Sequence, residues 1–278
     1  MQQISIAGGK VNPIGLGTLN MGEDLKNFDQ EISAIRTGID NGMQVIDTAE
    51  MYGSGKAETF VGEAIAPYNR EELFLISKVL PSNASKRQLP KSLDDSLKRM
   101  NTDYLDLYLL HWPGPVPLQE TVEALEKEKN KGKIKAWGVS NLDINDMNKL
   151  LQLSQGENCA TNQVRYNIID RGIEYDLMPK MDEYHMPMMS YAPVVRKKFS
   201  DKQNVLEQIA EKHQATIHQV LLAWNIRNKN TIAIPQSSKA EHVYDNSQAV
   251  NIELTKEDLE KIDEVYPKPT SSEPLALW

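Results

Sequence analysis

Three polar residues follow one another along the chain at a nearly constant spacing, each at the end of an apolar run. They are Asp47, Lys78 and His111, which lie 31 and then 33 positions apart. A strand–helix–strand unit takes about 30 residues, so this spacing is typical of successive parallel strands. In a parallel barrel the carboxyl ends of all strands meet on one face, where active sites are found. We therefore expect an acid, an ammonium group and an imidazole to converge there, with Tyr52 just beyond the first strand.

Apolar runs and helical segments alternate along most of the remaining chain. Helical spacing of apolar residues predicts helices over 31–39, 92–100, from 121 towards 133, and 216–228. The predicted strands cover 14–18, 44–48, 73–79, 105–111, 134–139, 159–164, 187–191 and 231–235. Eight strands that alternate with helices predict an α/β fold, the (β/α)8 TIM barrel.

Three further elements are expected outside this alternation. Residues 4–11 read as a β-hairpin that turns at the glycine pair Gly8-Gly9 and closes the amino-terminal end of the barrel. Two extra helices are expected near 203–213 and near 255–265, the latter beginning at Thr255 as its N-cap.

A length of 278 residues is normal for one such barrel, and no linker divides the chain, so we predict a single domain over 1–278. The tail after residue 267 is rich in Pro and Ser and is expected to be irregular. We expect Leu275 to Trp278 to reach back towards the open mouth of the barrel.

Composition excludes several classes of function. A net charge of −8 argues against nucleic acid or an anionic membrane as partner, since both favour clustered Lys and Arg. The single cysteine, Cys159, cannot form an intrachain disulfide and is interpreted as a small buried hydrophobe. His213 and His218 lack a metal-ligand pattern, so no metal is expected, and His213 fits a helix C-terminus. The amino terminus lacks the features of a signal peptide, which predicts a cytoplasmic protein.

The four polar residues suit the delivery of one proton to a carbonyl oxygen. A tyrosine titrates near pH 10, so we expect the ammonium of Lys78 to stabilise the phenolate and lower the pKa of Tyr52. A buried lysine needs a counter-charge, which Asp47 would supply. A neutral imidazole at His111 would orient the carbonyl or relay its proton. The hydride must then come from outside the protein.

Each of these residues, taken alone, has a structural interpretation as well. Asp47 can cap a helix, Tyr52 can be a packing residue, and His111 can be a hydrogen-bonded core histidine. Lys78 is harder to explain structurally, because lysines are rarely buried without a role. The convergence of all four on one barrel face favours catalysis.

The segments that carry these residues resemble the signatures of the aldo-keto reductase superfamily, in its bacterial methylglyoxal-reductase-like branch. The matching segments are Asp47-Thr48-Ala49-Glu50-Met51-Tyr52-Gly53, Ile76-Ser77-Lys78-Val79, 103–113, Gly15-Leu16-Gly17-Thr18, Gly138-Val139-Ser140-Asn141, Asn162-Gln163 and Ser190-Tyr191-Ala192-Pro193. They run in order over nearly the whole chain. The resemblance implies an NAD(P)H-dependent oxidoreductase that reduces aldehydes and ketones to alcohols, acts on small carbonyl compounds and is a monomer by default.

The resemblance also implies individual roles. Tyr52 would be the general acid, Lys78 and Asp47 the pair that tunes it, and His111 the residue that orients the substrate. The nicotinamide carboxamide would bind Ser140, Asn141 and Gln163, while Tyr191 would stack on the ring. Further cofactor contacts are implied for Gly17, Thr18, Asp47, Pro193, Ile234, Gln236, Ser237, Ser238, His242, Asp245 and Asn246. The substrate side would be lined by Met21, Tyr52, His111, Trp112 and the tail around Trp278. The usual Trp after Gly-Leu-Gly-Thr is here Leu19, which suggests a wider pocket.

The phosphate-binding segment departs from the family pattern. The usual Lys is replaced by Gln236 and the usual Arg by His242, so both cations for the 2′-phosphate of NADPH are missing. Two outcomes stay open: either NADH is accepted comparably well, or Lys239 or the cluster Arg196-Lys197-Lys198 supplies replacement charge next to bound NADPH. We favour the second, because three cations cluster at 196–198.

Two other functions remain as alternatives. A lysine at a barrel strand end can form a Schiff base, as in aldolases, although an ammonium paired with Asp47 is a poor nucleophile. A barrel of this kind can also bind NADPH as a redox-sensing or regulatory protein with slow turnover.

Overall fold

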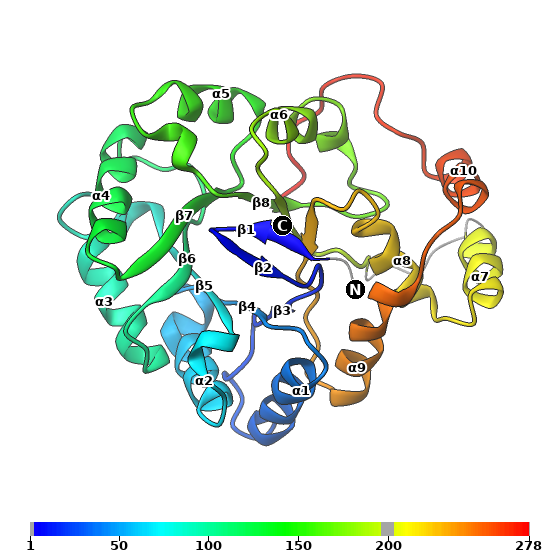
Figure 1. The fold of residues 1–278 in the computed structure, drawn as a ribbon, viewed down its shortest axis with the longest axis horizontal. Coiled ribbons are helices and arrows are strands. Elements are labelled where there is room, and N and C mark those ends of the chain that lie inside the picture. The colour runs from blue at the N-terminus through cyan, green and yellow to red at the C-terminus, as the bar shows by residue number, and fades with distance from the viewer. Residues whose placement is uncertain (1–2, 196–202, 278) are drawn as a thin grey trace.

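The computed structural model describes residues 3–195 and 203–277, and their core is a ring of parallel strands surrounded by helices (Figure 1). The eight strands of the sheet are β3 (Leu16–Gly17), β4 (Val45–Asp47), β5 (Phe74–Val79), β6 (Leu105–Leu110), β7 (Ile134–Ser140), β8 (Asn162–Arg165), β9 (Met188–Tyr191) and β10 (Thr231–Ala233). Each strand pairs in parallel with the next in sequence. The predicted α/β barrel order is therefore confirmed.

The two ends of the sheet also meet, which closes the barrel. Ile14 forms an isolated parallel bridge with Ala233. Ala233 N–H donates to Pro13 O at 2.8 Å, and Gly15 N–H donates to Ala233 O at 2.8 Å. Gly17 N–H then donates to Pro235 O at 2.9 Å. Closure leaves no unpaired sheet edge to the barrel.

The described part of the chain contains ten α-helices. Eight of them follow the strands and form the outer ring: α1 (Phe28–Asp40), α2 (Lys56–Ile65), α3 (Leu89–Met100), α4 (Leu118–Asn130), α5 (Ile144–Gln152), α6 (Leu177–Glu183), α8 (Ile217–Asn225) and α9 (Ala240–Gln248). The two extra helices are α7 (Gln203–Lys212) and α10 (Lys256–Val265), which pack against each other outside α8 (Figure 1). Both were predicted, and the Thr255 side chain accepts from Asp258 N–H as the expected N-cap. His213 directly follows α7, at its carboxyl end as predicted.

The hairpin β1 (Ile4–Ile6) and β2 (Gly9–Val11) closes one end of the barrel. Ile4, Ile6 and Val11 share one apolar cluster with interior strand residues such as Ile76 and Leu107. The turn lies one residue earlier than predicted, because Ile6 pairs with Gly9. Ala7 and Gly8 form it with φ of 52° and 76°, the left-handed conformations that match strand twist in a two-residue turn.

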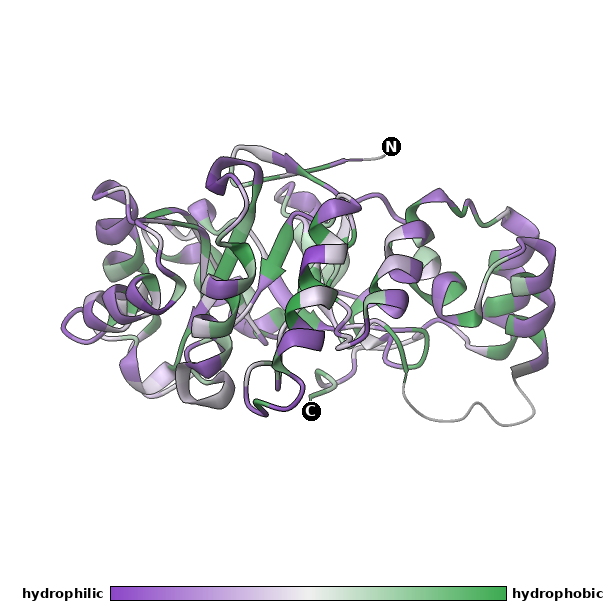
Figure 2. Ribbon diagram, turned by 90° about the horizontal axis from the view of Figure 1, so that it is seen from below, coloured by the Kyte–Doolittle hydropathy of each residue, from purple (hydrophilic) through white to green (hydrophobic). Residues whose placement is uncertain are grey.

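The hydrophobic residues gather on the strands and on the inner helix faces, and the polar residues lie on the outside (Figure 2). Cys159 is buried as expected; its thiol contacts Thr161 O, and burial raises its pKa to about 12. Within the described residues no helix is both long and apolar enough to span a bilayer.

The carboxyl-terminal segment ends on the face opposite to the hairpin (Figure 2). Ser272 attaches this segment to the start of α6, because its hydroxyl donates to Asp176 Oδ2 at 2.6 Å. Leu275 packs against the core, and Trp278 lies outside the described residues. The tail thus reaches the predicted face of the barrel, but residues 275–277 do not line the cavity described below.

Candidate active site

The predicted catalytic residues extend the inward-facing rows of the barrel strands. Because side chains alternate along a strand, residues two apart point to the same face. Val45, Ile76 and Leu109 belong to the apolar interior of the barrel. Two positions further on each of these strands, at the carboxyl end, stand Asp47, Lys78 and His111. The end of the barrel opposite to the hairpin therefore presents polar side chains, whereas the barrel interior next to it is apolar.

Tyr52 reaches this end from a short turn after β4. The turn continues through Gly53, Ser54 and Gly55, which all have positive φ, and leads into α2. Gly55 is required there, since its φ is 90° and a Cβ would lie 2.7 Å from Arg99 Cδ. The phenol is buried and packs against Ala49 and Ala57.

Lys78 connects the acid and the phenol. Its fully buried Nζ donates to Asp47 Oδ2 at 2.6 Å, to Thr48 O at 2.8 Å and to the Tyr52 hydroxyl at 3.3 Å. Burial lowers the pKa of Lys78, but Asp47 and Tyr52 raise it by more, so the net shift is upward. Lys78 is therefore an ammonium that holds the Tyr52 oxygen in place.

The expected decrease in the pKa of Tyr52 is wrong. Burial raises this pKa, and Lys78 offsets only part of the increase, while Asp47 raises it further. The transfer of a phenolate from water into this buried site costs more free energy than its attraction to one ammonium group restores. Tyr52 therefore keeps its proton at neutral pH and can donate it to an oxygen on which negative charge develops.

His111 is a neutral imidazole beside this phenol. The rings of His111 and Tyr52 lie edge to face with centroids 5.7 Å apart. Burial, and after it the charge of Lys78, lowers the pKa of His111 to about 2. A neutral ring can donate one hydrogen bond to a carbonyl oxygen without a competing positive charge.

The predicted nicotinamide-binding residues form one hydrogen-bonded network next to these four residues. The Ser140 hydroxyl donates to Gln163 O at 2.8 Å, and Asn141 Nδ2 donates to His111 O at 3.1 Å. The Tyr191 hydroxyl donates to Asn141 Oδ1 at 2.9 Å. Burial raises the pKa of Tyr191, so this residue is a neutral aromatic platform.

A cavity of about 860 Å³ opens over these residues, within the size range of ligand pockets. It runs from Asp47, Tyr52 and His111 to α8 and α9. Fifteen of the predicted site residues line it: Gly17, Thr18, Asp47, Tyr52, His111, Ser140, Gln163, Tyr191, Pro193, Ile234, Gln236, Ser237, His242, Asp245 and Asn246. Leu19 lines it too and is partly exposed there.

The chain shows features that fit a dinucleotide in this cavity. Tyr191 offers an aromatic face on the cavity wall. At the far end, the amino terminus of α9 has no side-chain cap, although Ser237 lies just before it. Free N–H groups at a helix start suit a phosphate.

Several predicted residues do not line the cavity. Met21 is fully buried in the core between barrel and helices, so its place on the substrate side is wrong. Lys78 and Asn141 lie behind the wall, where Lys78 donates to the Tyr52 hydroxyl and Asn141 accepts from the Tyr191 hydroxyl. Trp112 packs against His111 with ring centroids 4.7 Å apart, and Ser238 accepts from Gln30 through its backbone oxygen.

Arg196 and Lys198 lie outside the described residues, so the relocated phosphate charge stays a prediction.

The sequence interpretation missed several residues of the cavity wall. They are Asn20, Arg165, Ile169, Asp170, Ala192, Val194, Val195, Thr216, His218 and Pro235. Strand alternation would have found Arg165, which stands two positions after Gln163 on the same strand. It pairs in register with Tyr191, and its Nε donates to Asp170 Oδ2 at 2.6 Å.

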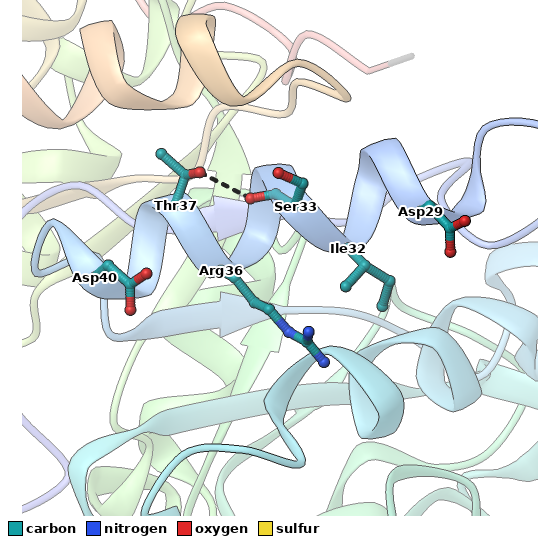
Figure 3. Close-up of a pocket in the computed structure, with 6 residues that line it drawn as sticks. All are labelled: Asp29, Ile32, Ser33, Arg36, Thr37 and Asp40. Carbon is teal, nitrogen blue, oxygen red and sulfur yellow. Dashed lines mark hydrogen bonds between the residues drawn. The ribbon is translucent and has the colours of Figure 1, made fainter.

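A second, shallow depression lies along the outer face of α1 (Figure 3). Arg36 crosses it and donates to the backbone oxygens of Glu63 and Ala64 in α2. The Thr37 hydroxyl donates to Ser33 O within the helix. These contacts are those of a surface helix that is fixed to its neighbour, so we assign no chemistry to this depression.

Comparison with known proteins agrees with this geometry. Residues 13–267 match the model of the aldo/keto reductase family. The chain is 46% identical to the methylglyoxal reductase YeaE of Escherichia coli (strain K12) over 268 residues, which make up 95% of this chain and 94% of that protein. It is 34% identical to the glyoxal reductase of Bacillus subtilis (strain 168), over 90% of this chain and 87% of that protein.

A solved structure is similar over the full length. The crystal structure of an aldo/keto reductase from Klebsiella pneumoniae in complex with NADP and acetate superposes with a TM-score of 0.95. The two sequences are 45% identical, and the match covers 100% of this chain and 99% of that chain.

Proposed function

The chain belongs to the aldo/keto reductase family, and from this premise we propose that it reduces small aldehydes and ketones to alcohols with NADPH. The observation that carries the proposal is the contact series from Asp47 through Lys78 to the Tyr52 hydroxyl at one end of the cavity. This series supplies a proton donor that is buried and fixed in position, beside a neutral imidazole. A carbonyl oxygen needs both when it becomes an alcohol.

The chain's residues hold the substrate and move one proton. Bound NADPH supplies the hydride for the carbonyl carbon. The neutral His111 donates a hydrogen bond to the carbonyl oxygen and orients it. Tyr52 gives its hydroxyl proton to the same oxygen, and the adjacent Lys78 ammonium stabilises the phenolate that remains. Asp47 keeps Lys78 charged and correctly placed.

Residues along the cavity would bind the cofactor. The face of Tyr191 would stack on the nicotinamide ring, and Ser140 and Gln163 would bind its carboxamide. Asn141, which lies behind the cavity wall, would hold Tyr191 in place through the hydroxyl of that tyrosine. The amino end of α9 with Ser237 would take a phosphate. We propose NADPH because the similar Klebsiella pneumoniae protein was crystallised with NADP. Arg196 and Lys198 remain our proposal for additional positive charge near the cofactor, and measurable use of NADH is expected.

The substrate class follows from the names of the relatives. Proteins 46% and 34% identical to this chain are a methylglyoxal and a glyoxal reductase. We propose that small 1,2-dicarbonyl compounds are substrates, together with simple aldehydes. We further propose that the whole chain is one domain and acts as a monomer.

A turnover assay tests this function. The loss of ultraviolet absorbance of NADPH is recorded with methylglyoxal, glyoxal and an aromatic aldehyde, and then with NADH. We expect turnover with both dicarbonyls and a higher kcat/KM with NADPH than with NADH. If the purified chain binds NADPH but reduces none of the carbonyl compounds, the alternative of a regulatory NADPH-binding barrel replaces this proposal.

The aldolase alternative is not favoured by the contacts of Lys78. A Schiff-base lysine must lose its proton to attack a carbonyl, whereas Asp47 and Tyr52 raise the pKa of Lys78. Treatment with borohydride in the presence of a carbonyl compound should therefore leave the mass of the chain unchanged.

A further inference from the structure

The two ends of the cavity differ in the charge that the chain can place there. This inference rests on the proposed function. If the nicotinamide lies at Tyr52 and Tyr191, the adenosine end of the dinucleotide lies at the other end, where α8 and α9 begin. Helices α8 and α9 are in contact near there, because Gln219 Nε2 in the first turn of α8 donates to Asp245 O in the second turn of α9 at 2.9 Å. The 2′-phosphate that distinguishes NADPH from NADH belongs to this adenosine end.

The wall at this end contains two histidines from different helices. His218 lies in the first turn of α8 and His242 in the first turn of α9, and both line the cavity. Asp245 and Asn246 line it as well, three and four positions after His242, so they share its helix face. Both histidines are at least partly exposed, which leaves them accessible to a ligand.

Other cations are scarce on the described cavity wall. Arg165 is the only arginine or lysine among the described lining residues, and it lies beside Tyr191, at the nicotinamide end. Lys239 occupies the N-cap position of α9 but does not line the cavity. Among the described residues that line the cavity around the start of α9, a side-chain positive charge can therefore come only from an imidazole that takes up a proton, while Lys239 stands beside this wall at the N-cap.

We propose that protonated His218 and His242 bind the 2′-phosphate of NADPH, so that the preference for NADPH over NADH depends on pH. The uncapped start of α9 adds backbone N–H donors to this site. Imidazoles change charge between about pH 5 and 8. The preference is therefore strongest on the acidic side of this range and declines as pH rises through it.

Other charged groups near His218 and His242 also contribute to the electrostatic potential at this end of the cavity. On α9, Glu241 Oε1 lies 3.7 Å from His242 Nε2, and Asp245 faces the same cavity. These carboxylates add negative charge to the wall, which repels a phosphate. Lys239 at the N-cap of α9 adds a fixed positive charge. Helix α7, which packs against α8, carries Glu207, Glu211 and Lys212, and Lys212 is paired with Asp258.

The test measures binding and not only turnover. The Kd values of NADPH and NADH are determined from protein fluorescence at pH 6.5 and pH 8.5, where the phosphate is mostly a dianion. We expect the ratio Kd(NADH)/Kd(NADPH) to fall about tenfold between these pH values, the size of one charge-assisted hydrogen bond. In the double variant His218→Gln and His242→Gln, the ratio should be low and nearly independent of pH.

Two further variants make the result specific. His242→Lys carries a charge that does not titrate in this range, so its ratio should stay high at pH 8.5. His185→Asn changes an exposed histidine that does not line the cavity and should behave as the unaltered protein. Calorimetry at pH 7.5 in buffers of different ionisation enthalpy should show proton uptake with NADPH, a smaller uptake with NADH, and no difference in the double variant.

Two results would overturn the inference. One is a ratio that does not change with pH in the unaltered protein, or that stays the same in the double glutamine variant as in the unaltered protein. The other is a ratio that falls in Arg196→Ala with Lys198→Ala but not in the histidine variants, which would place the phosphate charge in 196–198. Failure of the proposed function itself would look different: neither cofactor would support carbonyl reduction, whatever the Kd ratio.

Discussion

Gln163 donates its side-chain amide to Asp47 Oδ1 at 2.7 Å, although the two residues lie 116 positions apart. Asp47 Oδ2 accepts from Lys78, so both oxygens of this carboxylate are used. The amide nitrogen of Gln163 is thereby committed to Asp47, which leaves its oxygen for the carboxamide of a nicotinamide. One residue thus connects the proposed cofactor site with the residues that hold the proton donor.

Gln163→Leu should damage both sites at once. The variant removes an acceptor for the carboxamide and one hydrogen bond from a buried carboxylate, which costs about 1–3 kcal/mol. We expect a Kd for NADPH about tenfold higher and a lower kcat. Binding and single-turnover kinetics separate the two effects, and an unchanged kcat would show that Gln163 does not support Asp47.

Tyr52→Phe should abolish most turnover and keep cofactor affinity. The phenylalanine fills the same space between Ala49 and Ala57 but has no proton to donate. We expect kcat with methylglyoxal to fall by at least about 100-fold, the usual contribution of a general acid. NADPH binding is measured in parallel by fluorescence. Full activity in this variant would exclude Tyr52 as the proton donor.

Lys78→Met should destabilise the protein because it leaves Asp47 buried without its counter-charge. Removal of one partner of a buried ion pair costs about 3–5 kcal/mol. The double variant Lys78→Met with Asp47→Asn should recover part of this loss of unfolding free energy but none of the activity. Urea unfolding of the two single variants and the double variant measures the coupling. Additive effects would mean that the 2.6 Å contact contributes little to folding.

His111 predicts a dependence of stability on pH. Its pKa is lowered to about 2 in the folded protein, whereas an unfolded histidine titrates near 6.5. Below pH 6.5 the unfolded chain therefore binds a proton that the folded chain does not, and stability falls as pH decreases. Between pH 6.5 and 5 this one residue should cost about 2 kcal/mol. His111→Asn should show a shallower decline of unfolding free energy over the same interval, and parallel curves would contradict the low pKa.

Leu19 predicts the size selectivity of the cavity. Its side chain lines the cavity and is 37% exposed, so a larger residue has space to extend over the opening. In Leu19→Trp, kcat/KM for a bulky aromatic aldehyde should fall by about tenfold, while methylglyoxal changes little. The same loss for both substrates would mean that the variant disturbs the cofactor and not the substrate side.

The placement of Asp47, Lys78 and His111 on one face was predictable, because residues at the carboxyl ends of parallel barrel strands all lie on the same face of the barrel. Each stands at the carboxyl end of an apolar run, and the fold brings those ends together whatever the loops do. Thr255 and the two extra helices were predictable for a local reason, since caps and helical spacing act within a few residues.

Other features depended on contacts that spacing does not encode. Met21 directly follows residues 17–20, which line the cavity, yet its side chain is buried in the hydrophobic core. Only its packing against neighbouring elements decides between these two places. His218 lies in the cavity wall because the start of α8 borders the cavity, and no local sequence pattern predicts this.

The sequence by itself determined the order of strands and helices and the identity of the three residues that end the inward-facing rows of the strands. Periodicity and residue chemistry are local properties, so they can be read along a chain. Only the tertiary structure decided the balance of energies at the site: the pKa of Tyr52 rises because burial outweighs a nearby ammonium. That balance depends on how much water is excluded and on which charges from distant segments come within a few ångströms, and both arise only when the barrel closes.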